Sequence, residues 1–119
     1  GIDHAQKAAE LARDAIEGAR PTNSGLPGIS TGPAAAYRHC YWSCRMAQEI
    51  GMRHAKKVGD IHEECGNNPP GKIAMNLKNN LWGRLAGKPG ADCDQRCRNL
   101  LNNGVLQTFP NGTPPKDIY

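Results

Sequence analysis

The stretch AYRHCYWSC, from Ala36 to Cys44, concentrates groups that can do chemistry. It holds Arg38, His39, two cysteines and three aromatic residues, although the whole chain has only one Phe, three Tyr and two Trp residues. An imidazole can remove a proton from a nucleophile or attack phosphorus itself. A guanidinium carries a fork of donors that matches two phosphate oxygens. Together these residue types indicate phosphoryl chemistry.

Further along the chain, a second imidazole is followed directly by a carboxylate, and two adjacent amides come later. If the segments pack together, one imidazole would act as the base and the other as the acid, while the carboxylate orients a ring. Amide and guanidinium donors would hold the phosphoryl oxygens, where charge accumulates. The candidate catalytic residues are His39, His62 and Glu63. The candidate substrate-binding residues are Arg38, Asn76, Asn79 and Asn80.

Each of these residues also has a plainer structural explanation. A histidine on an apolar helix face is more often a hydrogen-bonded core residue than a catalyst, because a buried polar group is tolerated once it is paired. Arg38 and Trp42 lie one helical turn apart, so stacking of guanidinium on indole would account for both. His62 and Glu63 could instead bind a divalent metal, although they lack the second histidine of the zinc-protease signature. The sequence itself requires no cofactor, and the identity of any metal stays open.

The cysteines form two pairs with the same spacing. Cys40 and Cys44 are four residues apart, as are Cys93 and Cys97, so each pair occupies consecutive turns on one helix face. Two such faces that meet antiparallel would form bridges from 40 to 97 and from 44 to 93. Zinc is the alternative, but structural zinc sites favour CxxC or CxxxxC spacing. We expect disulfides, as in small secreted domains, and a buried, apolar role for Cys65.

Helical spacing and turn residues predict the elements that position these groups. Asp3 is a suitable N-cap for a first helix, and a Gly-, Pro- and Ser-rich connector follows that helix. Gly51 or Gly59 is expected to interrupt the longest helical stretch, and Gly104 to cap the last one. The expected helices run over residues 3–18, 34–65, 72–86 and 91–103.

No alternating strand pattern of useful length appears, so we expect an all-α fold. At 119 residues the chain has the size of one domain with a modest core. We predict a small bundle of about four to five helices with disulfide staples. Residues 1–30 would form the N-terminal helix and connector, and residues 31–119 the helical core with an irregular tail.

Counting 3.6 residues per turn predicts which side chains face inward. His39 falls on the apolar side of its helix, and the second half of the same stretch repeats the pattern with His62. We therefore expect both imidazoles to point into the core, with Glu63 near the edge of the apolar stripe. In the third helical stretch the asparagines form a polar strip beside a core seam. That expected seam consists of Ile73, Leu77, Leu81 and Leu85.

Charge and hydropathy limit the classes of partner. The formal net charge of +4 and a pI near 8.9 favour anionic partners. Mean hydropathy is -0.66, and no window approaches the roughly 20 apolar residues that a membrane span requires. Basic residues are not interleaved with aromatic ones into a binding track, so nucleic acid is not an expected partner. A nuclease toxin and a non-enzymatic membrane-perturbing or binding module remain alternatives.

Four segments in order, AYRHCYWSCRMAQEIG, GDIHEE, MNLKNNLWGRLAG and CDQRCRNLLNNGVL, resemble the C-terminal toxin domains of bacterial polymorphic secreted toxins. The resemblance covers about residues 36–106. Such domains are grouped with Wnt-like, lipid-associated helical folds called the Lipocone group, whose members are mostly inferred to act on lipid head groups or lipid-linked sugars. The resemblance maps these residues to the polar positions of a pocket: Arg38, His39, His62, Glu63, Asn79 and Asn80.

The resemblance implies a secreted antibacterial toxin domain, delivered to the target cell envelope or periplasm as a monomeric domain of a larger protein. It implies a hydrolase or transferase that acts on phosphate-containing lipid head groups or lipid-linked envelope precursors. It also implies a cognate immunity protein, and the basic charge favours an acidic one that covers the pocket mouth. The chain departs from the pattern in one run: where Asp-Leu-His-Asn-Asn is expected, it reads Asn76, Leu77, Lys78, Asn79, Asn80. That missing carboxylate counts against metal-dependent or carboxylate-assisted catalysis.

Overall fold

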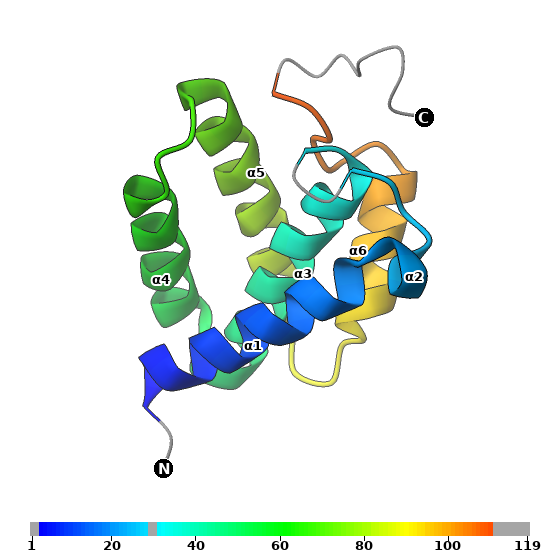
Figure 1. The fold of residues 1–119 in the computed structure, drawn as a ribbon. Helices are drawn as coiled ribbons and strands as arrows, with labels where there is room; N and C mark the ends of the chain where they lie inside the picture. The colour runs from blue at the N-terminus through cyan, green and yellow to red at the C-terminus, as the bar shows by residue number, and fades with distance from the viewer. Residues whose placement is uncertain (1–2, 29–30, 111–119) are drawn as a thin grey trace.

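The computed structural model describes residues 3–28 and 31–110, and it confirms the all-α class (Figure 1). The described part of the chain forms α1 (His4–Ala19), α2 (Pro21–Ser24), α3 (Pro33–Ile50), α4 (Met52–Cys65), α5 (Pro70–Ala86) and α6 (Cys93–Asn102). The end of the predicted irregular tail lies outside the described residues. The division into residues 1–30 and 31–119 stays a prediction.

Helix α3 is the centre of the bundle. It packs against α1, α4, α5 and α6, and nearly all of its residues from Pro33 to Ile50 are buried or half-buried. In Figure 1, α4 lies to the left of α3, α6 lies to its right, and α1 crosses in front. The AYRHCYWSC stretch therefore carries many reactive and aromatic side chains because it belongs to a helix with neighbours on every side.

Local signals set the helix ends largely as expected. The Asp3 side chain accepts a hydrogen bond from the Gln6 amide at 2.8 Å, so it caps α1. Gly51, at φ 88, breaks the long helical stretch into α3 and α4, whereas Gly59 continues α4 without interruption. Pro21 lies just after the end of α1 and begins the four-residue helix α2, which the sequence did not indicate.

Both predicted disulfides are present. Cys40 pairs with Cys97 and Cys44 with Cys93, and the two Cα atoms of each bridge are 5.8 Å apart. Helices α3 and α6 therefore meet antiparallel on these faces. Cys65 is the free cysteine and is exposed, so its expected burial was wrong.

A polar contact adds to the α3–α6 junction. The Tyr37 hydroxyl donates a hydrogen bond to the Asp94 carboxylate at 2.6 Å. The Arg98 guanidinium lies over the Tyr37 ring, 5.3 Å from its centroid, and donates to the Ser24 carbonyl of α2 at 3.1 Å. Tyr37 thus joins α3 to α6, and Arg98 extends this junction to α2.

Helix α5 is rotated relative to the expected orientation, so that only Ile73 and Leu77 of the predicted seam are half-buried. Its asparagine strip is buried, whereas Leu81 and Leu85 of the predicted seam are 45% and 49% exposed. Two glycines explain this choice, because they let the α5 backbone approach α3 very closely. A Cβ atom on Gly83 would lie 2.3 Å from the Cys40 carbonyl oxygen, and one on Gly87 would lie 2.5 Å from the Cys44 carbonyl oxygen. Close backbone packing thus outweighs the burial of two leucines.

Helix α4 is also turned relative to the expected stripe. His62 and Ile61 are exposed, whereas Ala55, Gly59 and Glu63 are buried. The inward orientation of His62 was therefore wrong, and so was the edge position of Glu63. The carboxylate can lie inside because it is paired: the side-chain amide of Asn76 on α5 donates to it.

The contact between α3 and α5 makes a direct prediction about stability. We expect Gly83→Ala to lower the free energy of unfolding by about 3 kcal/mol, because the new methyl group would overlap backbone atoms of α3. Gly18→Ala is the matched control, since open space surrounds that helical position. It should raise stability by about 0.5–1 kcal/mol through helix propensity. Urea denaturation measures both, and equal stability of the two variants would contradict this packing.

The described helices include none that is long and apolar enough to cross a membrane.

Candidate functional site

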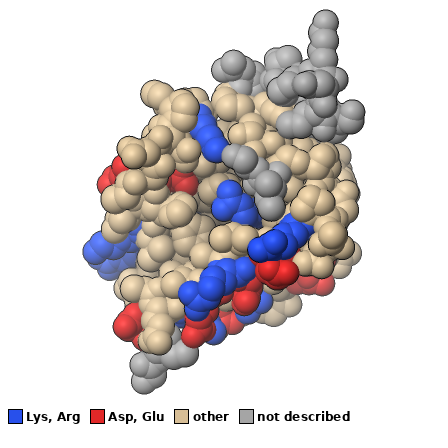
Figure 2. All heavy atoms as spheres, in the orientation of Figure 1, with Lys and Arg blue, Asp and Glu red and all other residues tan. Residues whose placement is uncertain are grey.

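A small pocket opens between α1, α3 and α4. Its volume is about 80 Å³, and Figure 2 shows a hollow with basic side chains on this face of the molecule, above α1. A water molecule takes about 30 Å³ of liquid, so the pocket has room for one small group such as a phosphate. Its lining residues are Ala12, Ala15, Ile16, Arg38, His39, Trp42 and His62.

His39 forms the buried part of this lining. It is 4% exposed, and its Nδ1 atom lies 4.0 Å from an oxygen of the Glu63 carboxylate. Burial is the main cause that lowers the pKa of His39 to about 3; the positive charge of Arg38 contributes to this shift, and Asn80 opposes it. The ring is therefore neutral at neutral pH, so its contact with Glu63 is between an uncharged ring and a carboxylate and is not a salt bridge.

A fixed carboxylate stands behind the imidazole. Glu63 is 2% exposed, and the Asn76 side-chain amide donates a hydrogen bond to its Oε1 at 2.9 Å. The other carboxylate oxygen is the one directed at His39. Asn76 is buried and does not line the pocket, so its place in the structure suits the positioning of Glu63. A carboxylate held in this way can fix the orientation and tautomer of a neighbouring imidazole.

Arg38 and His62 lie at the more accessible side of the pocket. Arg38 is half-buried; burial lowers the pKa of its guanidinium, and the Glu63 charge opposes that change. His62 is exposed and packs edge-on against Trp42, with the ring centroids 5.2 Å apart. Trp42 also donates a hydrogen bond to the Ala8 carbonyl of α1 at 3.0 Å. The indole thus has a hydrogen bond to α1 and a ring contact with His62, and no stacking of Arg38 on it is found among the described residues.

The two adjacent asparagines have different positions. Asn79 donates to the Gln107 carbonyl at 2.7 Å and accepts from the Gln107 amide at 2.8 Å, so it holds the segment after α6. Both the nitrogen and the oxygen of its side-chain amide are thus bonded away from the pocket. Asn80 is completely buried beside His39 and Gly59, and it does not line the pocket. The structure therefore brings His39, His62, Glu63 and Arg38 together, with Asn76 and Asn80 behind them and Asn79 elsewhere.

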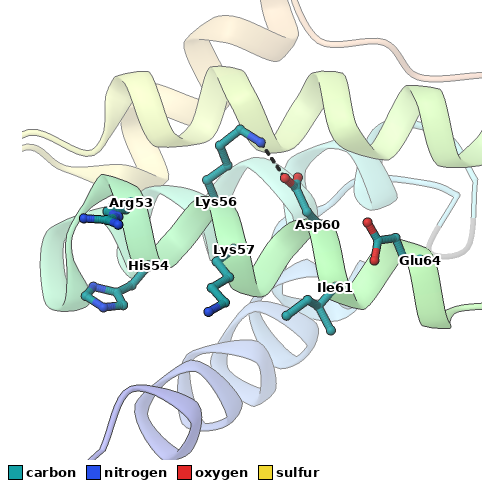
Figure 3. A pocket seen from close by; sticks show the side chains of 7 residues that line it. All are labelled: Arg53, His54, Lys56, Lys57, Asp60, Ile61 and Glu64. Carbon is teal, nitrogen blue, oxygen red and sulfur yellow. Dashed lines mark hydrogen bonds and ion pairs between the residues drawn. The ribbon is translucent and has the colours of Figure 1, made fainter.

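A larger hollow, of about 660 Å³, lies on the outer surface of α4 (Figure 3). All its lining side chains come from this one helix: Arg53, His54, Lys56, Lys57, Asp60, Ile61 and Glu64. Figure 3 shows Lys56 and Asp60 pointing together to one side, where they form an ion pair, and Lys57 pointing to the other. The charges are mixed and solvated, so this hollow lacks the converging groups of the His39 pocket.

No group of three or more His, Cys, Asp or Glu side chains that could hold a metal ion occurs in the part of the chain that the structure describes. The identity of any metal stays as open as the sequence left it.

A family model described as a domain of unknown function, DUF6973, matches residues 2–111, which is almost the whole chain. The chain belongs to the DUF6973 family. No solved structure matches it. The family description assigns no activity, so the resemblance of this DUF6973 domain to polymorphic-toxin domains remains a prediction.

One wall of the pocket in this DUF6973 domain was not expected from the sequence. Ala12, Ala15 and Ile16 of α1 supply it, although α1 precedes the segments that carry the polar residues. Only the amphipathic spacing of α1 could have indicated that the helix covers something, and this spacing does not say what it covers. The bond between Asn76 and Glu63 was also missed, because it depends on the unexpected rotation of α4 and α5.

The neutral state of His39 predicts how the stability of the DUF6973 domain depends on pH. Between pH 6.5, the ordinary pKa of histidine, and about 3, the unfolded chain binds a proton at this residue that the folded domain does not bind. The free energy of unfolding should therefore decrease as the pH falls below 6.5, by up to about 1.4 kcal/mol per pH unit. Above pH 6.5 His39 should cause no such loss. Chemical denaturation between pH 7.5 and 4 measures it. His39→Gln should flatten the slope, and an unchanged slope would assign the acid sensitivity to other groups.

Proposed function

We propose that this domain is a secreted antibacterial toxin that hydrolyses a phosphoester in a lipid head group or in a lipid-linked envelope precursor. The observation that carries the proposal is the buried imidazole of His39, beside the Glu63 carboxylate, at a pocket that also has an apolar wall and the Arg38 guanidinium in its lining. His39 is uncharged in the neutral pH range, so it can accept a proton, but its low pKa makes it a weak base in the free domain, and closer approach of Glu63 in the complex must raise its basicity.

The reaction needs one proton acceptor and one proton donor. His39 removes a proton from a water molecule through the ring nitrogen not directed at Glu63, and the water oxygen forms a bond to phosphorus. The bond from phosphorus to the leaving alcohol oxygen breaks, and His62, in its protonated form, donates a proton to that oxygen. Exposed His62 then regains a proton from solvent, and His39 releases its proton to water that enters the pocket it lines.

Glu63 and Arg38 support this step electrostatically. The imidazolium that forms on His39 is stabilised by the negative charge of Glu63, and the 4.0 Å separation of the two groups shortens in the complex, as catalytic hydrogen bonds often do. Arg38 donates to the phosphoryl oxygens, where negative charge increases in the transition state. Its half-buried position makes that interaction stronger than it would be in water.

The shape and lining of the pocket favour an amphipathic substrate. About 80 Å³ admits the reacting group but not a whole ligand, since pockets that enclose drug-sized ligands measure about 300–1,000 Å³. The remainder of the substrate must lie along the rim, where Ile16 is 42% exposed. An apolar rim suits the hydrocarbon part of a lipid, whereas a nucleic acid would require a track of cations and aromatic rings.

The two disulfides support an extracytoplasmic place of action, because such bridges persist in oxidising compartments. On this basis the domain would work in the target cell envelope or periplasm, as a monomeric part of a larger secreted protein. A cognate immunity protein would protect the producing cell. These statements rest on the resemblance to toxin domains together with the bridges.

The test is to incubate the oxidised domain with total bacterial lipids, with the lipid-linked cell-wall precursor added, and to identify products by mass spectrometry. Parallel samples contain RNA or dye-loaded vesicles. We expect a phosphate-containing lipid to lose its head group or phosphate. Degradation of RNA alone would support a nuclease, dye release without any lipid product would support a membrane-perturbing module, and no change in any sample would overturn the enzyme.

A further inference from the structure

Large apolar side chains of α5 lie at the surface beside α6. Leu81, Trp82 and Leu85 are 45%, 37% and 49% exposed, and they are neighbours on one face of the helix. Half-buried Leu100 of α6 lines the same hollow as Trp82 and Leu85. These four residues form the α5–α6 patch. They cannot turn inward, because Gly83 holds the opposite face of α5 against α3.

The rim of the α5–α6 patch is basic and polar. Arg96 lines the hollow together with Asn99 and Asn103, and exposed Lys78 lies one helical turn before Trp82. Helix α5 contains no Asp or Glu, and no acidic side chain lines the hollow among the described residues. Arg96 therefore has no acidic neighbour within the lining of the hollow.

The centre of the patch is concave. The hollow measures about 260 Å³ and is bounded by the Trp82 ring and the Leu85 and Leu100 side chains. A tryptophan and an arginine beside an apolar hollow are the residue types that contribute most to binding energy in protein interfaces. A hollow of this kind accepts a side chain that protrudes from another protein.

We propose that the α5–α6 patch binds a partner protein that presents an apolar side chain surrounded by acidic residues. The apolar side chain would enter the hollow, and the acidic residues would face Lys78 and Arg96. Such an arrangement removes the exposed leucines and Trp82 from water while it neutralises the rim.

Two other occupants fit the patch less well. In a symmetric dimer the same patch would face itself, so that Lys78 and Arg96 of both copies would meet without acidic groups to offset them. A lipid bilayer has anionic head groups, but it offers no protruding side chain to fill a concave surface. The charge and the shape together favour an acidic protein.

The α5–α6 patch is separate from the His39 pocket. The patch is on the side of α5 that faces away from α3, whereas the pocket lies between α3, α1 and α4. A partner bound to the patch leaves the pocket uncovered. The proposal therefore does not depend on the proposed hydrolysis, and its test reads binding alone.

The experiment selects peptides from a phage-displayed random library on the oxidised wild-type domain. The affinities of the enriched peptides are then measured for wild type, Trp82→Ser, Arg96→Glu and the control Ile61→Ser, which alters a similarly exposed residue on α4. We expect peptides with an aromatic or leucine residue flanked by Asp and Glu. Trp82→Ser and Arg96→Glu should each weaken binding at least tenfold, and Ile61→Ser less than twofold.

Several outcomes would overturn the proposal. One is that the enriched peptides lack acidic residues, and another is that Trp82→Ser leaves the affinity of the enriched peptides unchanged. A dimer seen in sedimentation that Trp82→Ser abolishes would assign the patch to a second copy. Binding to phosphatidylglycerol vesicles that Trp82→Ser abolishes would assign it to a bilayer. Melting temperatures establish that the variants fold, and Leu85→Ser replaces Trp82→Ser if the latter does not.

Discussion

Replacement of His39 by glutamine should reduce hydrolysis of the lipid phosphoester at least about 100-fold, because a general base typically contributes 10²–10⁴ to the rate. Glutamine is polar and of similar size but cannot accept the proton at neutral pH. The free energy of unfolding should stay within about 1 kcal/mol of the wild-type value, since no large cavity is created. Product formation by mass spectrometry and denaturation curves measure the two quantities separately.

Two further variants distinguish catalysis from structure. Glu63→Gln retains an oxygen that accepts from Asn76 but removes the negative charge behind His39, so activity should fall about tenfold or more. His54→Gln changes an exposed histidine of α4 that does not line the pocket, and it should leave activity unchanged. If His39→Gln unfolds the domain, or if it folds and remains active, His39 is a structural residue and the site lies elsewhere.

Reduction of both disulfides should produce the largest loss of stability. The bridges close segments of 57 and 49 residues, and a loop of that size corresponds to about 4 kcal/mol in the chain-entropy description. The two loops overlap, so the contributions are not simply additive. We expect the melting temperature to fall by more than about 10 °C, because 1 kcal/mol corresponds to about 4 °C for a domain of this size.

Calorimetry with and without reductant measures this change. Cys44→Ser should lower the melting temperature and affect activity only through unfolding, whereas Cys65→Ser should have no effect on stability, since that thiol is free and exposed. Mass spectrometry of the non-reduced domain provides an independent check. Four free thiols at residues 40, 44, 93 and 97 in a folded, fully stable domain would refute the role of the bridges.

Features encoded locally could be predicted from the sequence. The Asp3 cap, the break at Gly51 and the cysteine spacing each depend on residues within one or two turns of one another. The antiparallel pairing of Cys40 with Cys97 followed because i and i+4 positions share a helix face. The all-α class and the positions of the long helices are consequences of such local signals.

The faces that α4 and α5 bury could not be predicted in the same way. Apolar periodicity favoured Leu81 and Leu85, but the contact between helices depends on which backbones can approach most closely. Gly83 and Gly87 make that approach possible only on the opposite face of α5. The polar groups on that face, including Asn76, can be buried because partners such as Glu63 arrive from a different helix. Helical spacing within one segment contains no information about this match.

The candidate site was therefore only partly predicted. His39 was placed inward because its own helix has a clear apolar side, and the structure confirms its burial. His62 and Glu63 were expected on the wrong sides of α4. Both still lie beside His39, because they are consecutive residues on the turn of α4 that is next to it. Adjacent residues on a helix point about 100° apart, so an error of one position exchanges an exposed group with a buried one.

The paired bridges also have a mechanical consequence. One bridge alone would let α6 pivot on α3, but a second bridge one turn away removes that rotation, so that the two helices form a rigid frame. His39 directly precedes Cys40, and its backbone is therefore fixed to this frame. Glu63 is on α4, which carries no bridge and joins α3 through Gly51. A change in the backbone separation of His39 and Glu63 therefore requires α4 to shift relative to the α3–α6 frame.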